Sequence, residues 1–209
     1  MSLDFELWGA GTARTLRPIW MAEELNLPYK LYPIGPRTGE TQTKEYTELN
    51  PKQKIPLLKH GDFLLSESLA ICRYLQDVSY SNEVFVSGEK TIKALEDQWC
   101  NFIYGELDET SLYVMRRHYD LKDIYGEAPE VVQSCREYFE KGLKVVEGTL
   151  AKQETLYGAE FSLADILLVT CLDWALAYKF KLPINTSNYH NKMKERKAYK
   201  KAVEINYNQ

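Results

Sequence analysis

The chain has 209 residues, of which 44% are hydrophobic and 27% are charged, a balance typical of a folded globular protein and not of a disordered chain. The formal net charge of −4 supplies no basic field for nucleic acid, so we expect no nucleic-acid partner. One basic run lies near the C-terminus, and we interpret it as the solvated face of a last helix: Lys192, Lys194, Arg196, Lys197, Lys200 and Lys201.

Neither a membrane segment nor a metal site is expected. The most apolar run, residues 166–177, is too short to cross a bilayer and contains Asp173, and the first residues lack the pattern of a secretory signal. No CxxC pair occurs, and widely spaced cysteines indicate buried free thiols in a cytoplasmic protein: Cys72, Cys100, Cys135 and Cys171.

The first 79 residues predict a thioredoxin-like α/β domain. Apolar residues alternate over residues 3–7 and predict a strand, helical spacing follows up to about residue 23, and a second strand covers residues 29–34. Such a β-α-β unit implies two parallel strands. A loop and a short helix around Tyr46 come next, then two apolar runs joined by a glycine-containing turn, which predict a β-hairpin, and then a helix from residues 66–68 onward.

The rest of the chain predicts a linker over residues 80–88 and an all-helical bundle over residues 89–209. Pro129 stands at the favoured first position of a long helix. The run from Ser162 to Asp165 is a capping-box variant, and the apolar helix that it begins is expected at the centre of the bundle.

Three segments of the first domain carry candidate chemistry. Pro56 opens a strand, and a cis bond there would leave the Ile55 main chain to pair with an extended peptide; an ordinary trans proline at a strand edge is the alternative. Ser68 lies at a helix N-terminus, where free N–H groups bind a carboxylate, and Glu67 beside it suits an ammonium group. Together they suit the α-amino-acid end of a γ-glutamyl peptide, although a plain helix cap explains the serine equally.

The third segment is the loop from Gly9 to Thr15, between the first strand and the first helix. Ligands bind at such positions in open α/β sheets. A hydroxyl there could donate to a thiolate and lower its pKa by about two units, which corresponds to roughly 2.7 kcal/mol.

These segments resemble those of the cytosolic glutathione transferase superfamily, with features of its bacterial, phi and nu types. The matching stretches are residues 7–29, 50–58 and 66–75, and residues 161–166 resemble the helix-capping motif of the family's second domain. The resemblance implies a homodimer in which reduced glutathione is a co-substrate, with no bound cofactor, acting in detoxification.

The resemblance also implies roles for individual residues. Glu67 and Ser68 would hold the γ-glutamyl end of glutathione, and the Ile55 main chain before cis-Pro56 would pair with the cysteinyl unit. Lys54 and Gln53 would bind the glycyl end, Thr12 would face the sulfur, and a second-domain pocket would take the electrophile, with three candidates: Tyr104, Tyr113 and Arg116.

Two departures from the family pattern leave alternatives open. Trp8 stands where Tyr-type members have their tyrosine, so Thr12, Thr15 or the positive charge of Arg14 would act on the thiol; Gln53 replaces the family's usual glycine.

The expected function is conjugation of glutathione to small hydrophobic electrophiles. A glutathione-dependent disulfide or peroxide reductase of the nu type, or a non-catalytic interaction module, are the alternatives.

Overall fold

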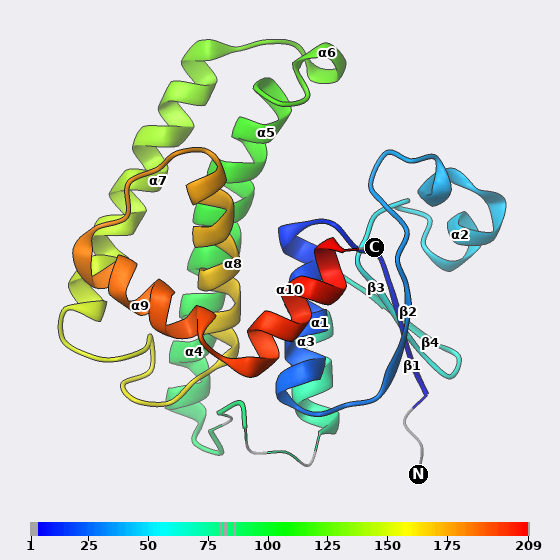
Figure 1. Ribbon diagram of the computed structural model, residues 1–209, viewed down its shortest axis with the longest axis horizontal. Coiled ribbons are helices and arrows are strands. Elements are labelled where there is room, and N and C mark those ends of the chain that lie inside the picture. The colour runs from blue at the N-terminus through cyan, green and yellow to red at the C-terminus, as the bar shows by residue number, and fades with distance from the viewer. Residues whose placement is uncertain (1–3, 80, 82, 86, 209) are drawn as a thin grey trace. The chain divides into compact units, whose positions relative to one another are not determined.

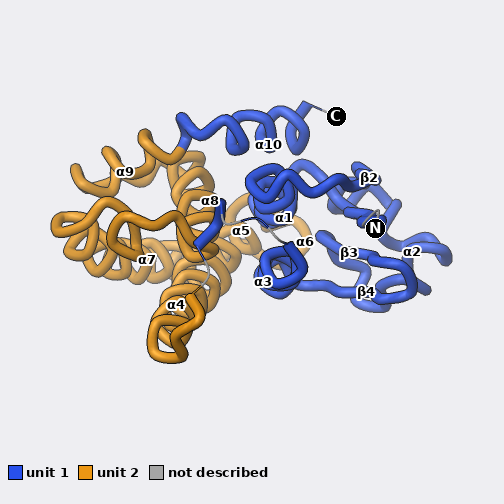
Figure 2. The backbone as a smooth tube through the Cα atoms, turned by 90° about the horizontal axis from the view of Figure 1, so that it is seen from below, with its two compact units in different colours: residues 1–86, 194–209 blue, residues 87–193 orange. Residues whose placement is uncertain are grey.

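The computed structural model describes residues 4–79, 81, 83–85 and 87–208 (Figure 1). The chain divides into two compact units, which Figure 2 shows in different colours. Unit 1 comprises residues 1–86 and 194–209, and unit 2 comprises residues 87–193. Unit 1 is therefore built from both ends of the chain.

Unit 1 contains a four-stranded mixed sheet in the order β2-β1-β3-β4. β1 pairs in parallel with β2 and antiparallel with β3, which pairs antiparallel with β4. A helix joins the parallel strands β1 and β2, and a tight hairpin joins the antiparallel strands β3 and β4. This arrangement confirms the thioredoxin-like α/β prediction. Leu3, expected in the first strand, lies outside the described residues. The strands are β1 (Phe5–Trp8), β2 (Tyr29–Tyr32), β3 (Leu57–His60) and β4 (Phe63–Ser66).

The core of unit 1 lies between this sheet and its helices. Strand residues Leu7 and Leu58 are fully buried, as are Leu16 and Ile71 on the two helices α1 and α3. Burial of a side chain of this size contributes about 1.5–3 kcal/mol, so these contacts hold the helices to the sheet. The helices of this part are α1 (Ala13–Glu24), η1 (Glu40–Gln42), α2 (Lys44–Leu49) and α3 (Ser68–Val78).

The last helix, α10 (Lys197–Tyr207), lies alongside α1 within unit 1 (Figures 1 and 2). Its buried Tyr199 packs edge-to-face on Trp20, with ring centroids 4.9 Å apart, and Ala202 is also buried. The sequence predicts residues 89–209 as one helical domain with a solvated basic run near its end, and four cations of that run are exposed: Lys192, Lys197, Lys200 and Lys201. In the structure, residues 194–209 group with unit 1, because the buried face of α10 is apolar while its cations bind carboxylates of α1.

Unit 2 is helical, as predicted. α7 begins at the predicted Pro129, and no helix among the described residues is both long and apolar enough to cross a membrane. The four cysteines are buried free thiols. The elements are α4 (Lys90–Phe102), the π-helical η2 (Ile103–Tyr113), α5 (Val114–His118), α6 (Lys122–Tyr125), α7 (Pro129–Leu150), α8 (Leu163–Ala177) and α9 (Ile184–Lys194).

The predicted capping box at the start of α8 is confirmed. The Ser162 N–H and hydroxyl donate to one carboxylate oxygen of Asp165, at 2.8 and 2.9 Å. The Tyr189 hydroxyl and the Leu156 N–H donate to the other oxygen. Burial raises the pKa of the Asp165 carboxyl, and these four hydrogen bonds oppose that shift. The cap therefore ties a loop and a neighbouring helix to the buried α8.

The predicted linker, residues 80–88, lies only partly within the described chain. Positions 80, 82 and 86 are outside the described residues, and the described positions between 81 and 88 form neither helix nor strand. The Gln76 side chain donates to the Phe85 carbonyl at 2.9 Å, so this part of the linker is bound to α3.

Candidate functional site

The loop after β1 approaches the segment before β3 very closely, and Gly9 makes this approach possible. Gly9 has φ +112°, and a Cβ atom added there would lie 2.6 Å from Cβ of Ile55. The Gly9 N–H donates to the Tyr32 carbonyl at 2.8 Å, which fixes the loop to the end of β2. The peptide bond between Ile55 and Pro56 is cis, as predicted.

The Ile55 main chain lies at this approach. Within the part of the chain that the structure describes, its N–H and C=O make no hydrogen bond to protein. Main-chain N–H and C=O groups in folded proteins almost always have a hydrogen-bond partner. The N–H and C=O of Ile55 therefore suit hydrogen bonds to an extended ligand, which would add a strand here.

Thr12 and Thr15 form a capping box at the start of α1. The Thr15 N–H donates to the Thr12 hydroxyl, and the Thr12 N–H donates to the Thr15 hydroxyl, both at 3.0 Å. Thr15 is fully buried, whereas Thr12 and Arg14 are half-buried. Of the two threonines, only Thr12 therefore presents its side chain to the surface of unit 1, next to the positive end of the helix dipole.

A fully buried arginine links α1 to the start of α3. Nη1 of Arg17 donates to Oγ of the buried Ser68 at 3.2 Å. Glu67 precedes Ser68 at the helix N-cap with φ +73°, an uncommon conformation for a residue with a side chain, and its carboxylate is exposed. A buried cation, the helix dipole and the free N–H groups of the first turn thus give this end of α3 a positive potential beside one exposed carboxylate.

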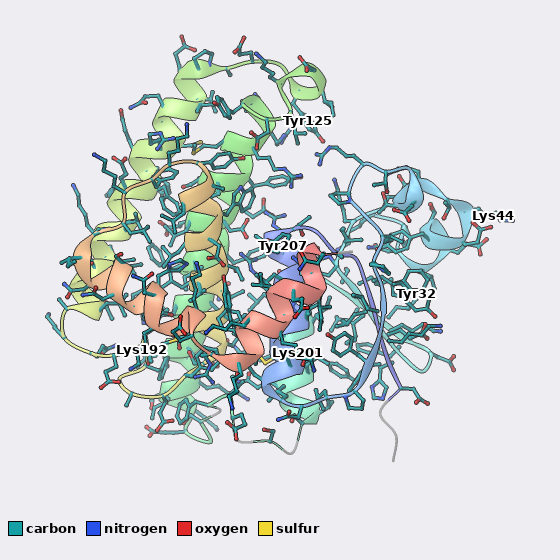
Figure 3. The ribbon with its side chains drawn as sticks, viewed as in Figure 1. Tyr32, Lys44, Tyr125, Lys192, Lys201 and Tyr207 are labelled. Atoms are coloured by element: carbon teal, nitrogen blue, oxygen red, sulfur yellow. The ribbon has the colours of Figure 1, made fainter. Side chains whose placement is uncertain are left out.

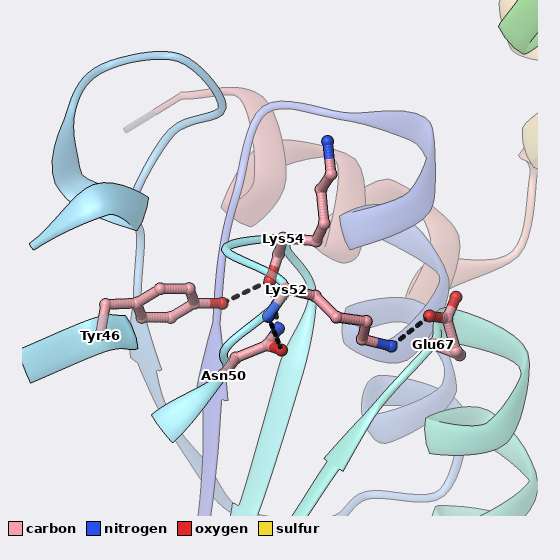
Figure 4. Close-up of polar contacts among 5 residues, drawn as sticks. All are labelled: Tyr46, Asn50, Lys52, Lys54 and Glu67. Atoms are coloured by element: carbon pink, nitrogen blue, oxygen red, sulfur yellow. Dashed lines mark hydrogen bonds and ion pairs between the residues drawn. The ribbon is translucent and has the colours of Figure 1, made fainter. Parts of the chain in front are cut away.

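That carboxylate is engaged by Lys52, whose Nζ lies 2.5 Å from Oε1 of Glu67 (Figure 4). Both side chains are about half exposed, so the ion pair contributes little to stability and can exchange for another cation.

Tyr46 and Asn50 fix the segment before the cis bond. The Tyr46 hydroxyl and the Asn50 side-chain amide donate to the Lys54 carbonyl at 2.6 and 2.8 Å (Figure 4). Burial raises the pKa of Tyr46 to about 12, which keeps that hydroxyl protonated. The Lys54 side chain is exposed, and Gln53 donates through Nε2 to the Thr47 hydroxyl at 3.0 Å. Gln53 has φ +54°, the left-handed conformation that favours glycine.

The electrophile-pocket candidates lie in the other unit. Tyr104 and Tyr113 are half-buried residues of η2, and Arg116 lies on α5. The Ser111 hydroxyl donates to the Glu106 carbonyl five positions earlier, at 2.8 Å, consistent with the wider π turn. The wider turn changes which residues of η2 share a face, because in a regular α-helix of about 3.6 residues per turn Tyr104 and Tyr113, nine positions apart (113 − 104), would lie on opposite faces.

Two contributors to the site were not identified from the sequence. Arg17 is not among the predicted site residues, although a charged residue within an apolar stretch of helix is a usable signal. Asn206, which binds the loop before α1, lies 195 positions from Gly11, and no local pattern distinguishes it.

Comparison with known proteins covers both units. Residues 3–77 match the family model "Glutathione S-transferase, N-terminal domain", and residues 105–204 match "Glutathione S-transferase, C-terminal domain". A wheat (Triticum aestivum) glutathione S-transferase is 30% identical over 78% of this chain and 74% of its own length. Bovine (Bos taurus) glutathione S-transferase theta-1 is 28% identical over 71% of this chain, and the alignment spans 63% of the bovine protein.

Solved structures share the fold. A Phanerochaete chrysosporium glutathione transferase, solved in complex with oxidized glutathione, superposes with a TM-score of 0.87 at 24% identity, covering 99% of this chain and 97% of that one.

Proposed function

Because the chain belongs to the cytosolic glutathione transferase superfamily, we propose that it binds reduced glutathione in unit 1 and transfers it to a small hydrophobic electrophile. The proposal assigns glutathione binding to residues 1–79 and the electrophile pocket to the helical domain. Glutathione is a co-substrate in this reaction, and no bound cofactor takes part.

The start of α3 is the observation that carries the proposal. The γ-glutamyl end of glutathione has a carboxylate and an ammonium group on one carbon. The Ser68 N–H and hydroxyl, backed by the buried Arg17, suit the carboxylate, and the exposed Glu67 suits the ammonium group. On binding, the ammonium group would replace Lys52 as the partner of Glu67.

The remaining groups of glutathione have matching partners in the same unit. The cysteinyl unit would pair with the Ile55 main chain beside cis-Pro56 as an added strand. The glycyl carboxylate would lie near Lys54, whose side chain is exposed, with Gln53 as a secondary donor.

Thr12 is our candidate for the group that donates to the sulfur. Thr12 is half-buried at the N-terminus of α1, and its hydroxyl suits a charge-assisted hydrogen bond, whereas Thr15 is buried and bonded to Asn206. Arg14 is half-buried on the same turn and would add positive charge. The thiolate then attacks the electrophilic carbon, a carbon–sulfur bond forms, and the leaving group departs with its electron pair.

A second candidate reaction uses the same thiolate. It would attack one sulfur of a disulfide, releasing a thiolate and leaving a mixed disulfide, which a second glutathione resolves to oxidized glutathione and another thiol. One observation favours this reaction: the loop from Gly9 to Thr15 contains no cysteine. The attacking thiol would therefore be that of glutathione and not one of the protein.

Calorimetric titration with reduced glutathione tests the proposal. Saturable binding near one site per chain is expected, and turnover of a halogenated dinitroaromatic compared with a small disulfide and a hydroperoxide separates the two reactions. Absence of heat and of thermal stabilisation at millimolar glutathione would overturn both and favour a non-catalytic interaction module.

Replacing Glu67 and Ser68 together by alanine is expected to weaken glutathione binding at least about 100-fold. Two interactions with charged groups, each worth about 1.5–3 kcal/mol, are lost. Ser87 and Glu89 stand at the start of α4 in unit 2, and their double alanine variant is the matched control. Equal affinity of the two double variants would refute the carboxylate site.

Thr12→Val is expected to raise the pKa of the bound thiol by about one to two units while changing glutathione affinity by less than about fivefold. The thiolate absorbance is titrated against pH in the complex. Thr43→Val removes a comparable cap, at the start of α2, and serves as the control because Thr43 accepts from the Tyr46 N–H. An unchanged thiol pKa would transfer the role to Arg14.

The remaining assignments complete the proposal. Tyr104, Tyr113 and Arg116 are proposed to line the electrophile pocket; both tyrosines belong to the π-helical η2. We also propose a cytoplasmic homodimer acting in detoxification, and sedimentation at micromolar concentration checks its mass.

A further inference from the structure

The side chain of Asn206 binds the loop that carries Thr12. Asn206 lies near the end of α10 and is almost completely buried, with 1% of its surface exposed. Its Oδ1 accepts from the Gly11 N–H at 3.2 Å and from the Thr15 hydroxyl at 2.7 Å. Its Nδ2 donates to the Thr12 carbonyl at 3.0 Å, and its own main-chain carbonyl accepts from the Gly11 N–H at 2.8 Å.

These partners fix which way the amide of Asn206 points. The Gly11 N–H can only donate and the Thr12 carbonyl can only accept, so Oδ1 must face the first and Nδ2 the second. A flipped amide would bring two acceptors together on one side and two donors together on the other. The site therefore selects asparagine with one orientation, and neither aspartate nor leucine of similar size reproduces it.

The same contacts direct the Thr15 proton. The Thr12 carbonyl accepts from Asn206 Nδ2 and from the Leu16 N–H at 3.0 Å, which occupies its two lone pairs. The hydroxyl of Thr15 has a single proton, and its shortest acceptor is Oδ1 of Asn206. The Thr12 carbonyl oxygen lies 2.9 Å from the same hydroxyl, but it already accepts two other donors, so the shorter contact to Asn206 takes the Thr15 proton.

We propose that Asn206 is a positioning residue for thiol activation: from α10 it holds the Gly11–Thr12 main chain and orients Thr15, which sets the place of the Thr12 hydroxyl. The inference rests on the proposed function of unit 1. It adds that a residue from the far end of the sequence, outside residues 1–79, determines the geometry at the sulfur.

The test compares Asn206→Ala with Asn208→Ala, since Asn208 is an exposed asparagine at the end of the same helix. For Asn206→Ala, we expect a tenfold fall in kcat and a rise of about one unit in the pKa of the bound thiol. The KM for glutathione should change less than about twofold, because the γ-glutamyl and cysteinyl contacts lie elsewhere in unit 1. Asn208→Ala should match wild type in all three.

Asn206→Asp provides a second variant that keeps the size of the side chain. It retains the acceptors for Gly11 and Thr15 but places a charged oxygen against the Thr12 carbonyl, so kcat and the thiol pKa should change at least as much as in Asn206→Ala. This variant decides the question if thermal melting shows that Asn206→Ala does not fold. Wild-type kcat and thiol pKa in a folded Asn206 variant would overturn the inference.

Failure of the proposed function is distinguishable by a measurement without glutathione. The Thr12 N–H donates to the Thr15 hydroxyl, which the side chain of Asn206 orients. Hydrogen exchange at the Thr12 amide should therefore accelerate several-fold in Asn206→Ala relative to Asn208→Ala. Faster exchange with no glutathione binding by the wild type would leave the positioning of Thr15 by Asn206 intact and overturn the role in thiol activation. Equal exchange would overturn the inference itself.

Discussion

Replacing Gly9 by alanine is expected to lower the free energy of unfolding by about 3 kcal/mol and to weaken glutathione binding at least about 100-fold. Gly9 has φ +112°, a conformation that costs a residue with a Cβ about 1–3 kcal/mol. The added Cβ would also lie 2.6 and 2.9 Å from two Ile55 atoms and 3.0 Å from a Thr15 methyl group. None of these is the far end of a flexible side chain, so the main chain beside the cis bond must move.

Gly39→Ala is the matched control for Gly9→Ala. Gly39 has φ +90°, but a Cβ there meets no atom within 4 Å. It should cost only the conformational strain and leave glutathione affinity unchanged. Thermal melting and calorimetry of both variants separate strain from collision. If the two variants bind glutathione equally, the contact between the loop and Ile55 does not shape the site.

Arg196→Met is expected to destabilise the protein by about 3–5 kcal/mol, because it leaves the buried Glu24 carboxylate without its cation. Nε and Nη2 of Arg196 lie 2.6 and 2.8 Å from the two oxygens of Glu24, and Trp20 Nε1 donates to the same carboxylate at 2.8 Å. For a chain of this length, the loss corresponds to a fall in Tm of roughly 6–20 °C.

Lys201→Met tests the second ion pair between the same two helices. The Lys201 side chain projects from α10 (Figure 3), and its Nζ lies 2.7 Å from Oε2 of Glu23. Since 64% of this lysine side chain is exposed, its removal should cost less than about 1 kcal/mol. The two carboxylates are similarly buried, with 7% of Glu24 and 11% of Glu23 exposed, so the variants compare a half-buried cation with an exposed one. A fall in Tm as large as that of Arg196→Met would mean that exposure of the cation does not set the cost of losing the ion pair.

Much of the fold follows from local sequence patterns. Alternation of apolar residues and a glycine-containing turn predicted the strands of unit 1, and Pro129 and the Ser162 capping box predicted the starts of α7 and α8. These signals act over a few residues, which is why they are readable. The π-helical course of η2 was not predicted, because the sequence predicts only that residues 89–209 are helical and does not distinguish π-helical from α-helical turns.

The site was predictable where a short motif carries it. Ser68 at a helix N-terminus and the cis bond before Pro56 were both found in this way. The buried Arg17 and the contact of Asn206 with the loop were not, since each depends on packing between segments distant in sequence. The placement of α10 in unit 1 follows from those same long-range contacts.

The return of α10 to unit 1 has a consequence for biosynthesis. Gly11 and its partner Asn206 are 195 positions apart, and at about 5–20 residues per second the ribosome needs roughly 10–40 s to make the intervening chain. α3 ends at Val78 and α10 begins at Lys197, 119 positions later (197 − 78), which takes roughly 6–24 s to make. In that part of the interval the nascent α/β unit has the residues of its sheet, α1 and α3 but lacks the helix that covers Trp20 and binds Glu24. Until α10 is made, the apolar face of α1 around Trp20 therefore lacks its cover, and the glutathione site that we propose is completed only after synthesis of α10.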